Sequence, residues 1–510
     1  MEAWFIILVS LCAYFSLKSL LSLLFPSYTS KKNESKIKLP PGPRPLPFIG
    51  NLLLVPKSVV DFRSVLLNLS HKYGPIITLY FGSKPVIFIT SYSVAHQALV
   101  RNSENFANRP PIVAVSSVLS NKHKDIGGSP YGPTWRTLRR NFISEVVHPT
   151  RVRSYTPERK RASEIMIEAF SQSSKKKEPV VVLDHIRHAV YYLFILMSFG
   201  ELSDSTLRAV EDVQHKLLVN YKHYSVFGTW PRLGKFLYRN RWKSYMNLLR
   251  SQYDLLFPLI RARKKLKQEK GEELDMVAYI DTLFDLQIPG EEGPLDESDI
   301  LSVCGELVNA GADTTITTLQ WIMAYIVKHP HVQAKLFSEI REIVGKDAEE
   351  VKEEDLNKAK YLKAVVMECL RIHPLSTSLG PHTVMEDVEL CGYTIPKGTI
   401  VNIVTSLIGR DPNVWKDPME FRPERLYTSD EIGEELSEVT AYKMMPFGAG
   451  RRICAGNKFG LFLLEYFVAN LVWRFEWKAV DGEDVDLSEM EQFLVVMKNP
   501  VRAHVSPRIK

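Results

Sequence analysis

The longest apolar segment of the chain lies at its amino terminus. Residues 3–25 are apolar except for four serines and Lys18. About 20 mostly apolar residues span a bilayer as a helix, and Lys18 lies toward the end of the segment, where its amine can reach the membrane surface. Basic residues predominate between positions 31 and 44. Because cytoplasmic flanks of membrane helices are rich in Lys and Arg, the pattern predicts a single transmembrane helix with the rest of the chain in the cytoplasm.

Two other interpretations of this segment are open. A cleavable signal peptide would have a shorter apolar region, preceded by positive charge and followed by a small-residue cleavage site. Here Glu2 precedes the apolar segment and no clear cleavage pattern follows it. A buried core helix is the other alternative, and the terminal position and basic flank disfavour it. We therefore expect residues 1–30 to form a membrane anchor with its basic flank.

A proline-rich run follows the expected anchor, from Leu39 to Gly50. Proline fixes φ and cannot donate a hydrogen bond, so the run is stiff and extended. A plain linker or a ligand for a proline-binding domain would have the same composition. The position directly after the anchor favours a hinge over residues 31–55 that sets the angle of the following domain to the membrane.

The remaining pattern predicts one large, mainly helical domain over residues 56–510. Residues 76–81 and 85–90 are strand candidates with the spacing of a hairpin. Long helical patterns predominate from about residue 150 onward. The longest runs from Asp296 to Lys328, with Asp296 as a candidate N-cap and Pro330 as the stop.

The middle of this longest helix breaks the local rules. Ala310-Gly-Ala-Asp-Thr-Thr315 places poor helix formers where the helix should be strongest. A broken rule in the middle of an element indicates a functional reason. A tolerated irregularity, with Thr314 bonding back to a carbonyl one turn earlier, explains the same residues equally well.

Residues 361–373 form a second amphipathic pattern that carries one charged pair. Glu368 and Arg371 are three residues apart, so they share a face of the helix. Apolar neighbours indicate that the pair is buried. By itself an ExxR spacing is a weak signal, because it occurs by chance in most large proteins.

The strongest chemical signal surrounds Cys454. Three glycines and two adjacent arginines precede or follow it within Pro446–Gly456, and the helical pattern 459–472 comes next. Glycines allow close backbone approach, and positive charge with a helix N-terminus lowers the pKa of a thiol. This arrangement suits a thiolate that ligates a metal. A buried structural cysteine or a nucleophilic cysteine are the alternatives, although no His stands nearby in sequence to activate a nucleophile.

Composition narrows the class of protein further. The 510 residues are 45% hydrophobic and 24% charged, with a net charge of +7. This excludes a disordered chain and a polytopic membrane protein, and it is too mild to indicate nucleic-acid binding. The five cysteines are scattered, without a disulfide framework or zinc spacing.

Several motifs together resemble the cytochrome P450 superfamily. Phe447–Gly456 is similar to its haem-binding signature, and the other motifs follow the same order and spacing. They are the WxxxR helix at Trp135–Arg139, the oxygen-activation motif at Ala310–Thr315, the ExxR pair at Glu368–Arg371, and the PERF segment at Phe421–Leu426, with Leu replacing the last Phe. The resemblance covers essentially the whole chain. It is greatest to the microsomal plant A-type members, in particular plant family eighty-nine.

This resemblance implies a role for each motif. Cys454 would be the axial thiolate ligand of the haem iron, with Phe447 beside the sulfur and Gly456 in the same loop. Trp135, Arg139 and Arg452 would bind the haem propionates. Asp313 and Thr314 would deliver protons, with Gly311 leaving room for oxygen. Glu368, Arg371 and Arg425 would form a structural network. His382 stands where many members have a propionate-binding Arg, so it is a further expected haem contact, with a satisfied structural histidine as the alternative.

The implied fold is mainly α, the cytochrome P450 fold, with small β-sheets around a haem and one N-terminal transmembrane helix. The implied activity is monooxygenation of a small lipophilic substrate, with haem b as cofactor and NADPH acting through a separate reductase. NADPH–cytochrome P450 reductase, cytochrome b5 and membrane lipid are the implied partners, nucleic acid is not, and the endoplasmic reticulum membrane is the implied location. An isomerase or dehydratase of an oxygenated lipid, and a haem-binding protein without turnover, are the alternatives. The resemblance also implies where substrate is recognised: residues 110–129, 221–230, the central helix before Asp313, 375–379 and 493–497. Their mixed apolar and Ser/Thr-rich composition fits a terpenoid, phenolic, alkaloid or fatty-acid-like molecule without choosing among them.

Overall fold

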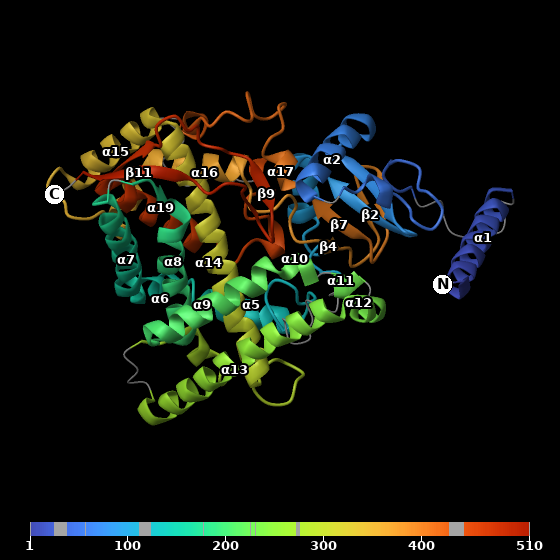
Figure 1. The fold of residues 1–510 in the computed structure, drawn as a ribbon, viewed down its shortest axis with the longest axis horizontal. Coiled ribbons are helices and arrows are strands. Elements are labelled where there is room, and N and C mark those ends of the chain that lie inside the picture. The colour runs from blue at the N-terminus through green and yellow to red at the C-terminus, as the bar shows by residue number, and fades with distance from the viewer. Residues whose placement is uncertain are drawn as a thin grey trace.

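The computed structural model describes residues 2–24, 38–56, 58–111, 124–176, 178–224, 226–229, 231–271, 276–427 and 443–508. Figure 1 shows a helix-rich body, a smaller sheet-rich region beside it, and α1 (Glu2–Leu24) beyond that region. The carboxyl end lies on the opposite side of the molecule. The predicted mainly helical architecture with small sheets is confirmed.

Helices account for most of the body, and long ones predominate after residue 150, as the sequence predicts. In chain order they are α2 (Val59–Tyr73), α3 (Tyr92–His96), α5 (Pro133–Glu145), α6 (Pro149–Ser154), α7 (Thr156–Ser174), α8 (Val182–Phe199), α9 (Asp204–Val219), α10 (Tyr221–Tyr224), α11 (Val226–Thr229), α12 (Pro231–Leu237), α13 (Arg239–Lys270), α14 (Glu297–Lys328), α15 (Pro330–Val344), α16 (Lys360–Ile372), α17 (Thr405–Ile408) and α19 (Asn457–Arg474).

In the described part of the chain, the strands form four small sheets. The largest has the order β1-β2-β7-β4, from β1 (Ile76–Phe81), β2 (Lys84–Ile89), β7 (Ile400–Ile403) and β4 (His382–Thr383). Its β1–β2 hairpin pairs Ile76 with Ile89 and confirms the predicted spacing. The other sheets are β3-β11-β8, β10-β9 and β5-β6, from β3 (Val180–Val181), β5 (Val388–Leu390), β6 (Tyr393–Ile395), β8 (Phe475–Ala479), β9 (Glu489–Glu491), β10 (Val495–Met497) and β11 (Arg502–Pro507).

Helix α14 is the central element of the helical body. Asp296 caps it by accepting a hydrogen bond from the Asp299 backbone amide at 2.7 Å, and it ends before Pro330, as the sequence predicts. It packs against α8, α9, α13, α16 and α19. Because neighbours cover most of its length, its residues after Asp313 are nearly all buried. The helix therefore holds the side chains of its middle turns in fixed positions.

The predicted anchor is helical, but its membrane-spanning character is not supported. The part of the chain that the structure describes contains no helix that is both long and apolar enough to cross a membrane. Ser10, Ser16, Lys18 and Ser19 all fall within α1 and reduce its apolar content. The basic flank, residues 25–30, and the first residues of the expected hinge, 31–37, lie outside the described residues.

The described part of the proline-rich run lies along strand β1. The Thr78 backbone amide donates to the Pro41 carbonyl at 2.9 Å, and the Asn51 side chain accepts from the Tyr80 amide at 2.8 Å. A Cβ at Gly42 would lie 1.9 Å from the Thr78 oxygen, so only glycine allows this approach. The run is thus fixed to the sheet-rich region.

Candidate functional site

A cavity lies between the middle of α14 and the loop that precedes α19. The space free of protein atoms is about 1060 Å³. Its walls come from distant parts of the sequence: Thr314 and Gly311 from α14, Cys454 and Phe447 from the loop, and Arg109 from the segment after α3. The structure therefore brings two separate sequence motifs to the same space.

The loop before α19 presents the Cys454 sulfur to this cavity. The Cys454 amide donates to the Phe447 carbonyl at 2.9 Å, which closes the loop. Gly450 has a φ of +70°, and a Cβ there would lie 1.8 Å from the Leu99 carbonyl oxygen. Since no other residue can make that approach, the glycine fixes the loop against the segment after α3. Phe447 and Gly456 line the cavity beside the sulfur.

The environment of the Cys454 thiol differs from the sequence-based expectation. Burial raises the pKa of the Cys454 thiol, and this outweighs the Gly456 backbone amide and the Arg139 charge, which both act to lower it. Arg451 and Arg452 point elsewhere: Arg451 donates to the Tyr131 hydroxyl at 2.8 Å, and Arg452 donates to the Ser129 carbonyl at 2.6 Å. Arg139 is therefore the cationic side chain that acts on this thiol.

The cationic side chains of Arg109, Arg139 and Arg452 line one part of the cavity. Arg109 donates to the Gly127, Gly380 and Pro381 carbonyls, and Arg139 donates to the Ile453 carbonyl at 2.7 Å. Trp135 donates its indole N–H to the Ile126 carbonyl at 3.1 Å, and the Arg452 guanidinium lies 4.5 Å from its ring centroid. The Trp135 ring therefore packs against the Arg452 guanidinium.

The charge in this cluster indicates what it can bind. Burial lowers the pKa of Arg109 to about 10 and that of Arg452 to about 9, with repulsion from Arg109 contributing to the second shift. Asp125 is the carboxylate that opposes both shifts. Three guanidinium groups near the two carboxyl groups of Asp125 and Glu306 leave a surplus of buried positive charge, which is costly unless an anion binds. The cluster fits a ligand with more than one carboxylate.

His382 lies behind the arginine cluster on strand β4. It is buried, and its Nδ1–H donates to the Phe106 carbonyl at 2.6 Å. Burial and the charges of Arg109 and Arg452 lower its pKa to about 3. The ring is therefore neutral at ordinary pH and holds the segment before Arg109. It is not among the residues that line the cavity.

The two residues of the central motif face different neighbours. The Thr314 hydroxyl lines the cavity and donates to the Ala310 carbonyl at 2.6 Å, which is the back-bonding that the sequence left open. Asp313 instead accepts from the Tyr191 hydroxyl at 2.5 Å and from His215 Nδ1 at 3.2 Å. Because Arg187 donates to the other nitrogen of His215, at 3.2 Å, Nδ1 must carry the hydrogen. Asp313 is thus tied to α8 and α9.

Gly311 is needed for packing as well as for space. It lines the cavity, but a Cβ there would lie 2.1 Å from the Phe194 ring of α8. Any larger residue would push α8 and α14 apart. The sequence-based role of leaving room for oxygen accounts for only part of this position.

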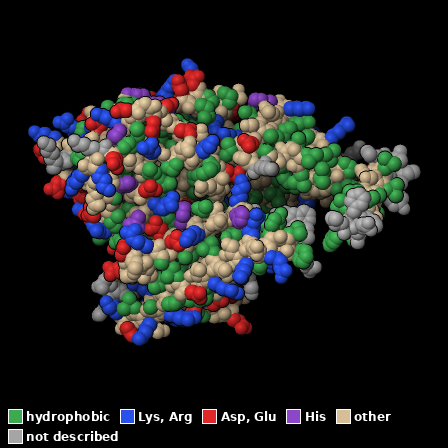
Figure 2. Space-filling view, in the orientation of Figure 1, with side chains coloured by type: hydrophobic (Ala, Val, Ile, Leu, Met, Phe, Trp, Pro, Cys, Tyr) green, Lys and Arg blue, Asp and Glu red, His purple; other side chains and the backbone are tan. Residues whose placement is uncertain are grey.

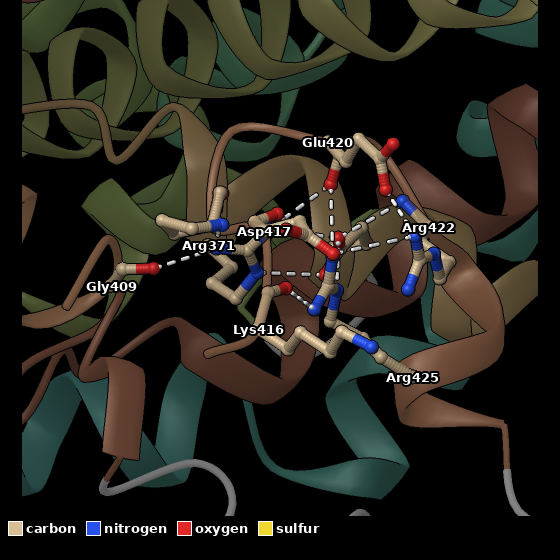
Figure 3. Close-up of polar contacts among 9 residues, drawn as sticks. Arg371, Gly409, Lys416, Asp417, Glu420, Arg422 and Arg425 are labelled. Carbon is tan, nitrogen blue, oxygen red and sulfur yellow. Dashed lines mark hydrogen bonds and ion pairs between the residues drawn. The ribbon is translucent and has the colours of Figure 1, made fainter. Parts of the chain in front are cut away.

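Glu368, Arg371 and Arg425 form one buried network away from the cavity. Glu368 accepts two hydrogen bonds from Arg371 and one from Arg425, each at 2.8 Å. Arg371 also donates to the Gly409 carbonyl, and Arg425 to the Lys416 and Asp417 carbonyls. Figure 3 shows both guanidinium groups turned toward this cluster of carbonyls. The network joins α16 to the segment that leads to the Cys454 loop.

A second cavity adjoins the first along α14, and we call it the outer chamber. It has about 1460 Å³ of space free of protein atoms. Gly127, Glu306, Ala310 and Thr314 line both spaces. Leu217, Leu301 and Phe493 give it apolar walls. A molecule in the outer chamber can therefore reach Thr314 and the space above the Cys454 sulfur.

Comparison with known proteins identifies the family to which this fold and this site belong. The sequence model of the cytochrome P450 family matches residues 40–506. The chain belongs to the cytochrome P450 family. It is 44% identical to cytochrome P450 89A9 of Arabidopsis thaliana, over 93% of this chain and 94% of that protein. It is 34% identical to the tabersonine/lochnericine 19-hydroxylase of Catharanthus roseus, over 94% of each chain.

The fold is also that of solved cytochromes P450. A zebra fish cytochrome P450 solved with progesterone is 25% identical, with a TM-score of 0.73 over 88% of this chain and 99% of that one. A zebra fish cytochrome P450 solved with abiraterone gives a TM-score of 0.71. The protein is a P450 monooxygenase and its cofactor is haem.

Sequence reasoning missed four residues of this site. Arg109 precedes the double proline 110–111 and belongs to no recognisable sequence motif. Tyr191 and His215 lie on helices that are far from Asp313 in the sequence. Glu306 stands one turn before the central motif. The helical period of residues 296–328 places Glu306 near the central motif, so the sequence could have indicated it. The positions of the other three residues depend on long-range contacts.

Proposed function

We propose that Cys454 is the axial thiolate of a haem and that the enzyme inserts one oxygen atom from dioxygen into a small lipophilic substrate. The observation that carries this proposal is a single cavity lined by the Cys454 sulfur, the Thr314 hydroxyl and an arginine cluster. Haem bound to a thiolate supplies the oxidising chemistry. Among the described residues that line the cavity, Cys454 is the only cysteine.

The arginine cluster would hold the haem carboxylates. Arg109, Arg139 and Arg452 place guanidinium groups in the cavity wall, and Trp135 and His382 hold the segments that carry them. A carboxylate bound there offsets the repulsion between Arg109 and Arg452 and restores their usual pKa values. Phe447 would pack beside the sulfur, and the backbone N–H of Gly456 would donate to it.

Thr314 would hold a proton donor at the reacting side of the cavity. Its hydroxyl rests on the Ala310 carbonyl and can rotate to donate into the open space. Asp313, one residue earlier, connects through His215 toward the outer surface of α9, where the imidazole is partly exposed. The two residues together would control when a proton enters the cavity.

The outer chamber would hold the substrate. It opens onto Thr314 and combines apolar walls with a few polar side chains, which is the usual composition of a small-molecule site. The name of the Catharanthus relative gives tabersonine and lochnericine as the compounds that it hydroxylates, which supports hydroxylation as the reaction. Part of the segment 110–129, expected to contact substrate, lies outside the described residues.

We also propose that α1 anchors the enzyme in the endoplasmic reticulum membrane, with the haem domain in the cytoplasm. The side chains of α1 whose exposure is described are mostly apolar and exposed, and Leu46, Phe48 and Leu53 add exposed apolar surface nearby. Figure 2 shows hydrophobic side chains gathered on the sheet-rich region that faces α1. NADPH–cytochrome P450 reductase would supply the electrons, with cytochrome b5 as a second donor.

The test is incorporation of oxygen from isotopically labelled dioxygen. Purified full-length enzyme with reductase and NADPH should transfer one labelled atom into product, and Thr314→Ala should retain haem while more NADPH is lost to hydrogen peroxide. Product formed without NADPH would indicate an isomerase or dehydratase. Haem binding with no product and no NADPH use across a broad library would indicate a carrier.

A further inference from the structure

The outer chamber has an unbalanced charge. The described residues that line it include the carboxylates of Asp125 and Glu306 but no Lys, Arg or His. Asp125 is committed to its own loop, because its Oδ1 accepts the Gly128 and Ser129 amides. Glu306 lies on the same helix as Thr314, two helical turns before it, and lines the same wall.

Glu306 is enclosed and forms no ion pair among the described residues, although the charge of Arg452 acts on it from the haem cavity. Its Oε2 accepts the Ile126 amide and its Oε1 the Gly127 amide, each at 2.7 Å. These contacts fix the carboxyl group between the outer chamber and the haem cavity. Each oxygen retains capacity for another hydrogen bond, so the group can accept from a molecule in either space.

An amide cluster adds further acceptors on the same wall. Gln214 Oε1 accepts from Gln252 Nε2 at 3.1 Å and from Asn309 Nδ2 at 3.4 Å. Because those donors are used, Asn309 presents its carbonyl oxygen, which is buried without a partner. Asn309 and Gln252 line the chamber, and Gly305 between them carries no side chain to cover it. Gln214 Nε2 is a donor without a partner, but Gln214 is not among the described residues that line the chamber.

The protonation of Glu306 is sensitive to what occupies the chamber. Burial raises its pKa to about 8, with Asp125 adding to the shift and Arg452 and the two backbone amides opposing it. Arg109 and Arg139 line the adjoining cavity, and Tyr279 faces Glu306 from the helical side. The carboxyl group is therefore largely neutral at pH 7 and becomes negative as the pH rises through about 8. A cation bound beside it would favour the negative form.

We propose that Glu306 and Asn309 form a recognition site for a cationic nitrogen, so that the substrate is a lipophilic amine. The apolar walls would hold the hydrocarbon part and the two acceptors would hold the charged end. An anionic substrate such as a fatty acid would meet two carboxyl groups and no Lys, Arg or His among the described residues that line the chamber. This inference rests on the proposed function only in taking the outer chamber as the substrate site.

The probes are a matched pair that differ in charge. Phenethyltrimethylammonium is cationic at every pH, and 2-methyl-4-phenylbutan-2-ol has nearly the same shape without the charge. Calorimetric titration of the haem-loaded full-length enzyme should give tighter binding of the cation at pH 9. Its affinity should rise about tenfold per pH unit below pH 8 and then level off, because only ionised Glu306 attracts it. Affinity for the alcohol should not change with pH.

Three variants assign the effect to individual groups. Glu306→Gln should abolish the pH dependence and leave affinity for the alcohol unchanged. Asn309→Leu keeps the carboxyl group, so it should weaken cation binding but preserve the pH dependence. Asp125→Asn removes a charge that raises the pKa of Glu306, so the inflection should move to lower pH. The reduced carbon monoxide spectrum confirms that each variant holds haem.

Clear outcomes would overturn the inference. Equal or tighter binding of the alcohol at pH 9, or cation binding that does not change with pH, would show that the chamber selects neutral molecules. A pH dependence retained in Glu306→Gln would assign it to another group. If Glu306→Gln loses haem, unchanged cation affinity in Asn309→Leu contradicts the site. Binding needs no turnover, so failure here is distinct from failure of the monooxygenase proposal.

Discussion

The pKa values and contacts of individual side chains in this enzyme depend on burial as much as on neighbours in the sequence. Cys454 illustrates this, because the two arginines before it in sequence donate to a tyrosine hydroxyl and to backbone carbonyls, which leaves Arg139 as the charge that acts on the thiol. Sequence motifs did not identify Arg109, although it donates to three carbonyls and lines the haem cavity. Its position follows from long-range packing that no local pattern encodes.

Replacing Arg109 with Met should weaken haem retention. The variant loses charge-assisted hydrogen bonds to a haem carboxylate, which are worth about 1.5–3 kcal/mol, so affinity for haem should fall at least about tenfold. The measurement is the ratio of haem to protein, followed by transfer of haem to apomyoglobin. Arg101→Met, at an exposed position, is the control and should behave like wild type. Equal haem loss from both variants would remove Arg109 from the site.

Glu465 on α19 should make stability depend on pH. Burial raises its pKa from 4.5 to about 7. A raised carboxyl pKa favours the folded state below pH 4.5, and that contribution is lost as the pH rises to 7. Glu465→Gln should therefore raise the free energy of unfolding at pH 8 by about 3 kcal/mol and leave it unchanged at pH 4.

Denaturant titrations of wild type and variant at both pH values provide this measurement. The control is Glu269→Gln, an exposed glutamate on α13, for which we expect a change below about 1 kcal/mol at either pH. A Glu465→Gln variant that is no more stable at pH 8 than at pH 4, relative to wild type, would contradict the buried environment described.

At the scale of elements, α14 unites the two cavities and the helical core. The sequence predicted its ends because capping and proline signals are local. It also predicted Glu368, Arg371 and Arg425 as a group, but not the Gly409, Lys416 and Asp417 carbonyls that complete the network. Those partners depend on how the later part of the chain folds back onto α16. The pattern of apolar and polar residues does not contain that information. The connection of Asp313 to α8 and α9 was hidden for the same reason.

Tyr191→Phe should loosen the contact between α8 and α14. The hydroxyl donates to the Asp313 carboxylate at 2.5 Å inside the core, and a buried hydrogen bond to a charged group is worth about 1.5–3 kcal/mol. The free energy of unfolding should fall by about 2 kcal/mol. Tyr192→Phe removes a hydroxyl from the next residue, which is only half-buried, and should cost much less. Equal losses from both would mean that the hydroxyl of Tyr191 has no special partner.

At the scale of the whole molecule, fold and family were predictable because the motifs keep their order along the entire chain. The membrane-spanning helix was predicted from residues 3–25, and the structure supports a helix but no span among the described residues. Substrate choice was not predictable, since the outer chamber combines side chains from several helices and loops. The acidic character of the outer chamber is visible only in the structure, where these side chains line one space.

Membrane topology provides a test at this scale. If α1 anchors the enzyme, protease added to sealed microsomes should digest the haem domain, because that domain would face the outside of the vesicle. The N-terminus of the mature protein should still precede residue 3. A luminal glycosylated marker protein, protected until detergent is added, is the control. Protection of the haem domain, or a mature chain that begins after residue 25, would refute the proposed anchor.

The most direct test of the whole account concerns the sulfur of Cys454. The reduced carbon monoxide complex of the wild-type enzyme should show the absorption band of a thiolate-ligated haem. Cys454→Ser should lose that band, while Cys391→Ser, which changes an exposed cysteine outside the described cavity walls, should retain it. A thiolate band that persists in Cys454→Ser would contradict the assignment of this residue as the haem ligand and, with it, the proposed site.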